Sequence, residues 1–181
     1  MTGWQRRPFF AGRHQALRDW LCEPGSLTAR LKRRGAFRIE LLGQSLRHAN
    51  RDECAALGIR PRTPCWVREV ALYCAGEPVI FAHTVLPAMP RGVLGRWFAR
   101  LGTRSLGSLL FAHPGFVRGK LAFARIDARH PLHAPASAVL GLPTAGAFAA
   151  RRCTHRFRRQ SVLVSEVFSP RLAKPGTPGA R

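Results

Sequence analysis

Residues 66–86 constrain the fold most strongly, because their pattern is that of two β-strands joined by a tight turn. The stretches 66–74 and 79–86 are rich in β-branched and aromatic residues, and the residues Ala-Gly-Glu-Pro between them are typical of a turn. A second pair of strand-like stretches, 151–159 and 161–168, follows near the C-terminus. The sequence therefore predicts an antiparallel sheet built around two hairpins.

Helix signals lie mostly outside these hairpins. Ser26 is a favourable N-cap for a helix over 27–34, which Gly35 ends. The other predictions are helices at 14–22, 93–101 and 105–111, strands at 36–42 and 117–127, and irregular structure at 45–65. Helices combined with mostly antiparallel strands give an α+β fold, and a length of 181 residues suits a single domain.

The composition also suggests where the domain begins and ends. Residues 1–13 form a basic N-terminal segment, and we expect the folded domain to span residues 14–168. Within it, residues 128–148 are rich in Ala, Pro, Gly and His, which is typical of a surface insertion. Residues 169–181 contain three prolines and two glycines, and we expect this tail to be disordered.

Two charged residues fall on otherwise apolar strand faces. Side chains alternate along a strand, so Arg68 shares a face with Trp66, Val70, Leu72 and Cys74 and is the only charge on it. By the same rule, Glu166 is the only charge on the face that carries Val162, Val164 and Phe168.

A buried ion is costly unless it is paired or binds a ligand, so each of these charges needs a partner. There are three alternatives for Arg68 and Glu166. They form a structural ion pair, one of them lies on a solvent-exposed face, or they line a pocket for a polar ligand. Glu69, the neighbour of Arg68 in the chain, is another candidate partner for it.

The net charge is strongly positive. Thirty Lys and Arg against nine Asp and Glu give 30 − 9 = +21, which attracts either nucleic acid or small dianions. The arginines are spread along the chain, and neither a zinc-finger spacing nor an RNA-binding aromatic strand is present, so we do not expect nucleic acid to be the primary partner. We expect His155 to lie on a solvated face, and the surrounding arginines either to be solvated as well or to steer an anion; these are Arg151, Arg152, Arg156, Arg158 and Arg159.

Five cysteines without a CxxC spacing argue against a disulfide framework and a zinc site and favour the reducing cytoplasm. Asp127, His130 and His133 have a spacing that metal ligands can show, but they lie in a Pro/Ala-rich stretch, so we expect no metal there. No run of about 18 apolar residues is present, so no integral membrane segment is expected.

Several motifs in order resemble the chorismate pyruvate-lyases, bacterial enzymes that supply 4-hydroxybenzoate for ubiquinone. WVREVALYCAGEPVIFAHTVLP (66–87) is similar to the central hairpin of that family, and VLVSEVFSP (162–170) to its last strand. The LG, LG and LF pairs of residues 101–111, and Trp20-Leu21 followed by Ser26-Leu27-Thr28, also match. The resemblance implies an antiparallel sheet whose helices cover a buried ligand pocket, two of them acting as flaps, and elimination of pyruvate from chorismate without a metal or other cofactor.

The resemblance also implies residue roles. The carboxylate-binding arginine of the family falls on Arg68, and the acidic residue near the ring hydroxyl falls on Glu166. Backbone amides that bind the same carboxylate fall on Leu27 and Leu106, although relatives can carry methionine at the position of Leu27. Arg68 and Glu166 are therefore the expected catalytic residues, and all four positions are expected to bind substrate.

Two positions depart from the family pattern. His83 stands where relatives often carry arginine, and Ala149 stands where an aromatic residue often precedes the Arg-Arg pair. A different class of function is a small-anion-sensing module of the same fold, as in bacterial transcription regulators, but we expect no DNA-binding domain because few residues precede position 36. We expect a monomer that acts on chorismate and releases 4-hydroxybenzoate and pyruvate.

Overall fold

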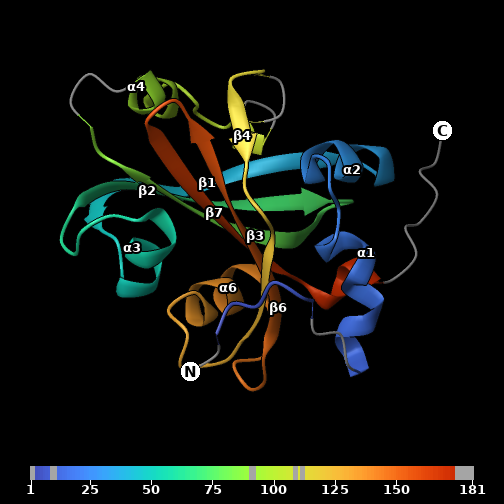
Figure 1. The fold of residues 1–181 in the computed structure, drawn as a ribbon. Helices are drawn as coiled ribbons and strands as arrows, with labels where there is room; N and C mark the ends of the chain where they lie inside the picture. The colour runs from blue at the N-terminus through green and yellow to red at the C-terminus, as the bar shows by residue number, and fades with distance from the viewer. Residues whose placement is uncertain (1–2, 9–11, 90–92, 108–109, 111–112, 174–181) are drawn as a thin grey trace.

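The computed structural model describes residues 3–8, 12–89, 93–107, 110 and 113–173. Its centre is one antiparallel sheet of seven strands in the order β1-β2-β3-β7-β6-β4, with β5 pairing with β6 beside β4 (Figure 1). The strands are β1 (Phe37–His48), β2 (Pro64–Cys74), β3 (Glu77–Pro87), β4 (Phe116–Arg118), β5 (Ala122–Ile126), β6 (Phe148–Phe157) and β7 (Gln160–Phe168). The α+β class and the two hairpins, β2–β3 and β6–β7, are confirmed.

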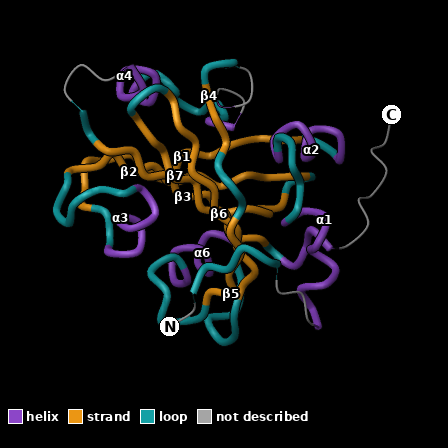
Figure 2. The backbone as a smooth tube through the Cα atoms, in the orientation of Figure 1, coloured by secondary structure: helices purple, strands orange, loops and turns teal. Residues whose placement is uncertain are grey.

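Helices cover both faces of this sheet (Figure 2). On the face that carries Arg68, the core contains α1 (Arg18–Leu21), α2 (Leu27–Arg34) and α4 (Val93–Ala99). On the opposite face, the core contains α3 (Arg51–Leu57) and α6 (His133–Leu140). The short 3-10 helices η1 (Gly12–Leu17) and η2 (Pro170–Ala173) complete the described elements, none of which is both long and apolar enough to cross a lipid bilayer.

Local sequence signals explain how α2 and the first hairpin form. The Ser26 hydroxyl accepts a hydrogen bond from the amide of Ala29, and the helix ends before Gly35, as predicted. The turn between β2 and β3 places Ala75 at φ 51° and Gly76 at φ 83°. Such positive φ angles match the twist of a two-residue hairpin, and glycine adopts them without steric cost.

Two predictions of local structure are wrong. Residues 45–65 are not irregular, because β1 continues to His48 and α3 follows it. Asn50 caps that helix: its side chain accepts from the amide of Glu53, and the Glu53 carboxylate accepts from the amide of Asn50. The predicted strand 117–127 is broken after Arg118, where Gly119 passes so close to Thr154 that an added Cβ would lie 2.6 Å from its hydroxyl oxygen.

The stretch expected to be a surface insertion instead contributes to the core. Leu132, Ala136 and Leu140 repeat every four residues along α6 and are at most 4% exposed, because they pack against the sheet. The predicted tail also begins as ordered structure, since Leu172 in η2 is 1% exposed; residues 174–181 lie outside the described ones. The basic N-terminal segment is joined to the sheet by two backbone hydrogen bonds between Gln5 and Phe123, each of 2.8 Å.

A buried ionic cluster joins α3 to the face of the sheet opposite Arg68. His83 lies between two carboxylates, with Nδ1 3.0 Å from Glu69 Oε1 and Nε2 3.0 Å from Glu53 Oε1. Burial alone would lower the pKa of His83, but the two carboxylates raise it to about 9, so the imidazole is charged at neutral pH.

Replacement of Leu140 by alanine should lower the free energy of unfolding by about 2–5 kcal/mol, because it opens a cavity in a fully buried position. Leu46→Ala, at a residue that is 54% exposed, is the matched control and should change it by less than about 0.5 kcal/mol. Urea denaturation measures both, and equal effects would show that α6 does not belong to the core.

The His83 cluster predicts a pH-dependent stability. Because the pKa of His83 in the folded chain is above that of a free imidazole, about 6.5, its contribution is complete below pH 6.5 and is lost as the pH rises through about 9. The free energy of unfolding should therefore fall over this range by an amount on the order of 2–3 kcal/mol. His83→Gln should lack this decline, and an unchanged slope in that variant would contradict the assignment.

Candidate functional site

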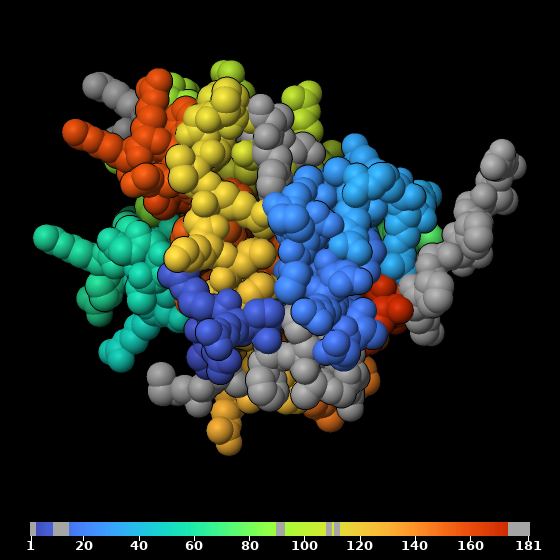
Figure 3. Space-filling model, turned by 45° about the vertical axis from the view of Figure 1, so that its right-hand side comes forward, coloured from blue at the N-terminus to red at the C-terminus, as the bar shows by residue number. Residues whose placement is uncertain are grey.

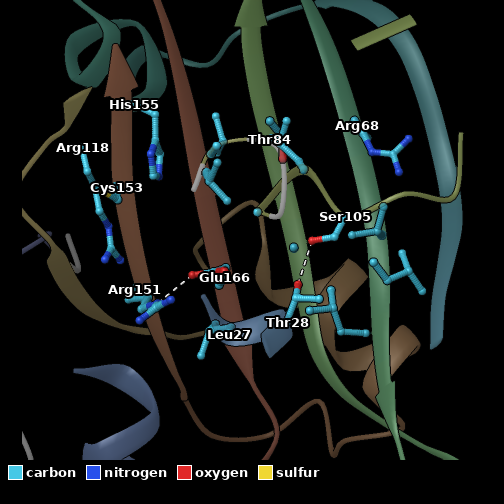
Figure 4. A pocket seen from close by; sticks show the side chains of 18 residues that line it. Leu27, Thr28, Arg68, Thr84, Ser105, Arg118, Arg151, Cys153, His155 and Glu166 are labelled. Atoms are coloured by element: carbon cyan, nitrogen blue, oxygen red, sulfur yellow. Dashed lines mark hydrogen bonds and ion pairs between the residues drawn. The ribbon is translucent and has the colours of Figure 1, made fainter. Parts of the chain in front are cut away.

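A pocket lies on the Arg68 face of the sheet (Figure 4). Atoms leave about 690 Å³ unfilled there, a volume that includes open solvent. Its apolar lining consists of Leu27, Ile39, Val70, Leu72, Ala82, Leu106, Leu110 and Val164. Its polar and ionisable lining consists of Thr28, Arg68, Thr84, Ser105, Arg118, Arg151, Cys153, His155 and Glu166.

Arg68 projects from the centre of β2 and is 2% exposed. Its Nη1 donates to Gln44 Oε1 at 3.1 Å, and its Nη2 donates to the carbonyl of Gly102 at 2.7 Å. Burial lowers the pKa of Arg68, but a guanidinium keeps its charge at neutral pH. No carboxylate neutralises Arg68 in the part of the chain that the structure describes, so an anionic ligand would supply the missing charge.

Glu166 projects from β7 into the same pocket. Its Oε2 accepts a hydrogen bond of 2.6 Å from Nε of Arg151, which lies directly opposite it on β6. In the described structure this is the only hydrogen bond to the Glu166 side chain, so Oε1 remains able to accept one from a ligand. A carboxylate held by a buried guanidinium has a defined orientation and stays inside the pocket.

Arg151 also connects the sheet to the helices above it. It is 2% exposed, and its Nη1 donates to the carbonyls of Leu21 at 3.2 Å and Glu23 at 2.9 Å. These carbonyls lie at and just after the end of α1, where helix carbonyls lack partners within the helix and attract cations. One side chain therefore orients Glu166 and fixes the segment that leads into α2.

Two covering segments meet above the pocket. The Thr28 hydroxyl of α2 and the Ser105 hydroxyl of the loop after α4 are 2.7 Å apart, and either oxygen can be the donor. Gly107 approaches the same hydroxyls closely, since an added Cβ would lie 3.3 Å from Ser105 Oγ and 3.7 Å from Thr28 Oγ1. Leu27 and Leu106 stand beside these two residues and line the pocket.

A third segment completes the cover. Arg118 of β4 donates a hydrogen bond to the carbonyl of Pro24, between α1 and α2. Figure 3 shows the blue α1–α2 segment lying directly against the yellow segment that holds β4 and β5. The pocket is therefore enclosed by parts of the chain that are distant in sequence.

The wall made by β4 and β6 is cationic and polar. Arg118 and His155 pair in register on these neighbouring strands, and Cys153 lies two residues before His155. Burial and the charges of Arg118 and Arg151 lower the pKa of His155 to about 4, so its imidazole is neutral at pH 7. Burial likewise raises the pKa of the Cys153 thiol, which keeps it protonated.

All four predicted site residues line this one pocket: Arg68, Glu166, Leu27 and Leu106. Arg68 and Glu166 do not pair with each other; Arg68 is buried, and Glu166 is partly buried and pairs with Arg151. Glu69 is not the partner of Arg68 either, because it binds His83 on the opposite face.

One prediction about the arginine-rich strand is wrong: His155 is 5% exposed and faces the pocket instead of lying on a solvated face. Of the arginines that were expected either to be solvated or to steer an anion, Arg151 is buried in the pocket lining. The alternation of side chains along strand β6 could have indicated this burial. One face of the strand carries Arg151, Cys153, His155 and the aromatic Phe157.

Asp127, His130 and His133 serve local structure. Asp127 accepts from the amide of Arg129 and His130 from the amide of Leu132, each within two residues. His133 is 3% exposed, stacks on Phe148 and lies 3.1 Å from the carbonyl of Gly146. Among the described residues no three His, Cys, Asp or Glu side chains converge as metal ligands, and the five cysteines are free thiols.

Known proteins resemble this chain over nearly its whole length. The sequence model of one family, described as chorismate lyase, matches residues 2–174. A probable chorismate pyruvate-lyase of Dechloromonas aromatica is 51% identical over 172 residues, which cover 93% of this chain and 95% of that protein. One of Aromatoleum aromaticum is 42% identical over 175 residues, with 93% and 92% coverage.

Solved structures show a similar arrangement of elements at low identity. The C-terminal domain of a histidine utilization repressor from Pseudomonas syringae has a TM-score of 0.60 at 10% identity and covers 81% of this chain and all of that domain. The effector domain of PhnF from Mycobacterium smegmatis has a TM-score of 0.54 at 18% identity, with 80% and 88% coverage. These likenesses support the fold alone.

The hydrogen bond between Thr28 and Ser105 should couple the two covering segments. Thr28→Val and Ser105→Ala should each lower the free energy of unfolding, and the double variant should lose about 0.5–1.5 kcal/mol less than the sum of the single losses. Urea denaturation of the four proteins measures this coupling. Thr28→Val combined with Thr63→Ala, whose hydroxyl bonds within its own turn, is the control and should be additive. Additivity in the Thr28–Ser105 pair as well would contradict the link.

Proposed function

The chain belongs to the chorismate lyase family, and from that premise we propose that it eliminates pyruvate from chorismate in the pocket between Arg68 and Glu166. The product of this reaction is 4-hydroxybenzoate, the ring precursor of ubiquinone. The observation that carries the assignment of the site is the convergence of one buried cation from β2 and one carboxylate from β7 on a single pocket.

Arg68 is suited to the ring carboxylate of chorismate. Its guanidinium is planar and can donate two parallel hydrogen bonds, and no carboxylate of the described chain neutralises it. The amides of Leu27 and Leu106 are proposed to donate to the same anion. Leu27 is the first residue of α2, and the amides at a helix start attract negative charge.

Glu166 is suited to the hydroxyl at C4, on the opposite side of the ring from the carboxylate at C1. Its Oε1 accepts a hydrogen bond from this hydroxyl, while Arg151 holds Oε2 in place. Between the two polar ends, Val70, Leu72 and Val164 contact the faces of the ring. A ring held at both ends is positioned for reaction.

The reaction breaks two bonds and needs no oxidant. The proton leaves C4 while the bond between C3 and the ether oxygen breaks, and the ring becomes aromatic. The released enolpyruvate takes up a proton at carbon and becomes pyruvate. Glu166 either orients the hydroxyl only or also accepts the C4 proton as a general base. The net charge of +21 produces a field that attracts the dianionic substrate.

The proposal also includes the compartment and the oligomeric state of the enzyme. Five free cysteines favour a reducing compartment, so we place the enzyme in the cytoplasm. We propose that the active unit is a monomer.

Ligand sensing without catalysis is the second candidate, because an effector domain of a regulator shares this fold. Absorbance of 4-hydroxybenzoate formed from chorismate by the pure protein separates the two functions. Binding of chorismate without turnover would overturn the assignment as a lyase.

Arg68→Ala should raise KM for chorismate roughly 100-fold, because it removes the charge-assisted hydrogen bonds to the ring carboxylate. Arg156→Ala removes the same charge from an exposed position of β6 and should change KM less than about twofold. Steady-state kinetics measures both. An unchanged KM for Arg68→Ala would show that this residue does not bind the carboxylate.

Glu166→Gln separates the two roles of the carboxylate. Glutamine keeps the size and still accepts a hydrogen bond from the hydroxyl, but it cannot take up the proton, so kcat should fall roughly 10²–10⁴-fold if Glu166 is the base. Glu40→Gln, at an exposed ion pair with Arg38, is the control and should be neutral. A kcat at saturating chorismate equal to that of the unchanged protein would remove any proton-transfer role.

A further inference from the structure

Two residues in the wall of the pocket made by β4 and β6, Arg118 and His155, have no part in the scheme above. Arg118 and His155 pair in register across these strands, and both line the pocket. In Figure 4 they lie on the same side as Arg151, on the opposite side of the pocket from Arg68. His155 is 5% exposed and Arg118 is half-buried, so this wall is partly shielded from solvent.

The charges of the pocket lining identify what this wall can bind. The lining contains three arginines and one carboxylate, so its net charge is 3 − 1 = +2 while His155 is neutral. Arg151 and Glu166 compensate each other, and Arg68 is assigned to one carboxylate. The remaining charge is that of Arg118, and a ligand with two carboxylates matches the total.

The substrate's own geometry points to the same wall. The enolpyruvyl group of chorismate branches from C3, the ring atom next to C4. When the C4 hydroxyl lies at Glu166, this branch must lie close to Glu166 and far from Arg68. Residues next to the Glu166–Arg151 pair are therefore the ones that the second carboxylate reaches, and Arg118 and His155 are on the strands at that end.

We propose that Arg118 and His155 form a second anion subsite, which receives the carboxylate of the enolpyruvyl group; this rests on the proposed lyase function. Arg118 supplies the charge, and the imidazole of His155 supplies a neutral hydrogen-bond partner. The subsite distinguishes the substrate, which has two carboxylates, from 4-hydroxybenzoate, which has one. Once enolpyruvate has left, the aromatic product no longer touches it.

Neutrality of His155 fits this role. Burial, followed by the charges of Arg118 and Arg151, lowers the pKa of His155. The two guanidinium groups give the wall a positive potential before a ligand binds. Burial raises the pKa of the Cys153 thiol, so the thiol stays protonated and does not compete for the cations. An incoming carboxylate therefore meets one guanidinium and two neutral groups.

Binding of two stable compounds tests the subsite without turnover. The first is 4-hydroxybenzoate. The second is 3-(1-carboxyvinyloxy)-4-hydroxybenzoate, an aromatic compound with both carboxylates. Arg118→Gln should lower the affinity for the dicarboxylate at least tenfold, as measured by calorimetry, and change the affinity for 4-hydroxybenzoate less than threefold. His155→Leu should also lower the affinity for the dicarboxylate, by less than Arg118→Gln does, and leave the affinity for 4-hydroxybenzoate unchanged.

Three further proteins control this comparison. Arg118→Lys keeps the charge and should retain part of the preference for the dicarboxylate. This variant keeps the proposal testable if Arg118→Gln does not fold. Arg156→Gln, at an exposed position of the same strand β6 as His155, should bind both compounds normally. Arg68→Gln should lower the affinity for both compounds.

The outcomes separate the two proposals. In one outcome, the unchanged protein forms 4-hydroxybenzoate from chorismate, but Arg118→Gln lowers the affinity for both compounds equally. Arg118 would then act through its hydrogen bond to Pro24, and the proposed subsite would be overturned. The subsite is also overturned if Arg118→Gln and His155→Leu bind both compounds normally. If the unchanged protein neither converts chorismate nor binds 4-hydroxybenzoate, the proposed function fails and the subsite falls with it.

Discussion

Burial of charge on one face of the sheet is the constraint on which the site depends. Arg68 and Arg151 are each 2% exposed, and a guanidinium removed from water must find acceptors inside the protein. Arg68 finds them in Gln44 and in the loop after α4, and Arg151 finds them in Glu166 and at the end of α1. The acceptors in the loop after α4 and at the end of α1 belong to segments that cover the pocket, so the interactions that stabilise the buried cations also position its cover.

The two faces of the sheet differ in their buried charges. The face opposite the pocket packs against α3 and α6, and its buried cation His83 lies between two carboxylates, Glu53 and Glu69. The pocket face retains cations in excess over carboxylates. An excess of this kind is unfavourable for an empty protein and favourable for one that binds an anion, which is why it identifies the ligand-binding face.

Alternation along strands indicated two residues of this site but left their role open. It placed Arg68 and Glu166 on apolar faces, and the resemblance of the flanking motifs indicated Leu27 and Leu106, all of which line the pocket. Arg151 and His155 were missed because five arginines within nine residues resemble a solvated surface, although their own alternation indicated a shared face. The helices α3 and α6 were missed because turn-forming residues surround them, whereas a capping pair at Asn50 and Glu53 and an apolar repeat from Leu132 to Leu140 were present. Which long-range contacts enclose the pocket could not be predicted, because alternation defines faces but not the loops that pack on them.

The position of bound product is the most direct test of the account. A crystal structure with 4-hydroxybenzoate should place its carboxylate about 3 Å from the Arg68 guanidinium and its phenolic oxygen within hydrogen-bonding distance of Glu166. The ring should lie between Leu72 and Val164, with the wall at Arg118 unoccupied by product atoms. A product bound in the reverse orientation, with its carboxylate at Arg118 or Arg151, or bound outside this pocket, would contradict the central claim.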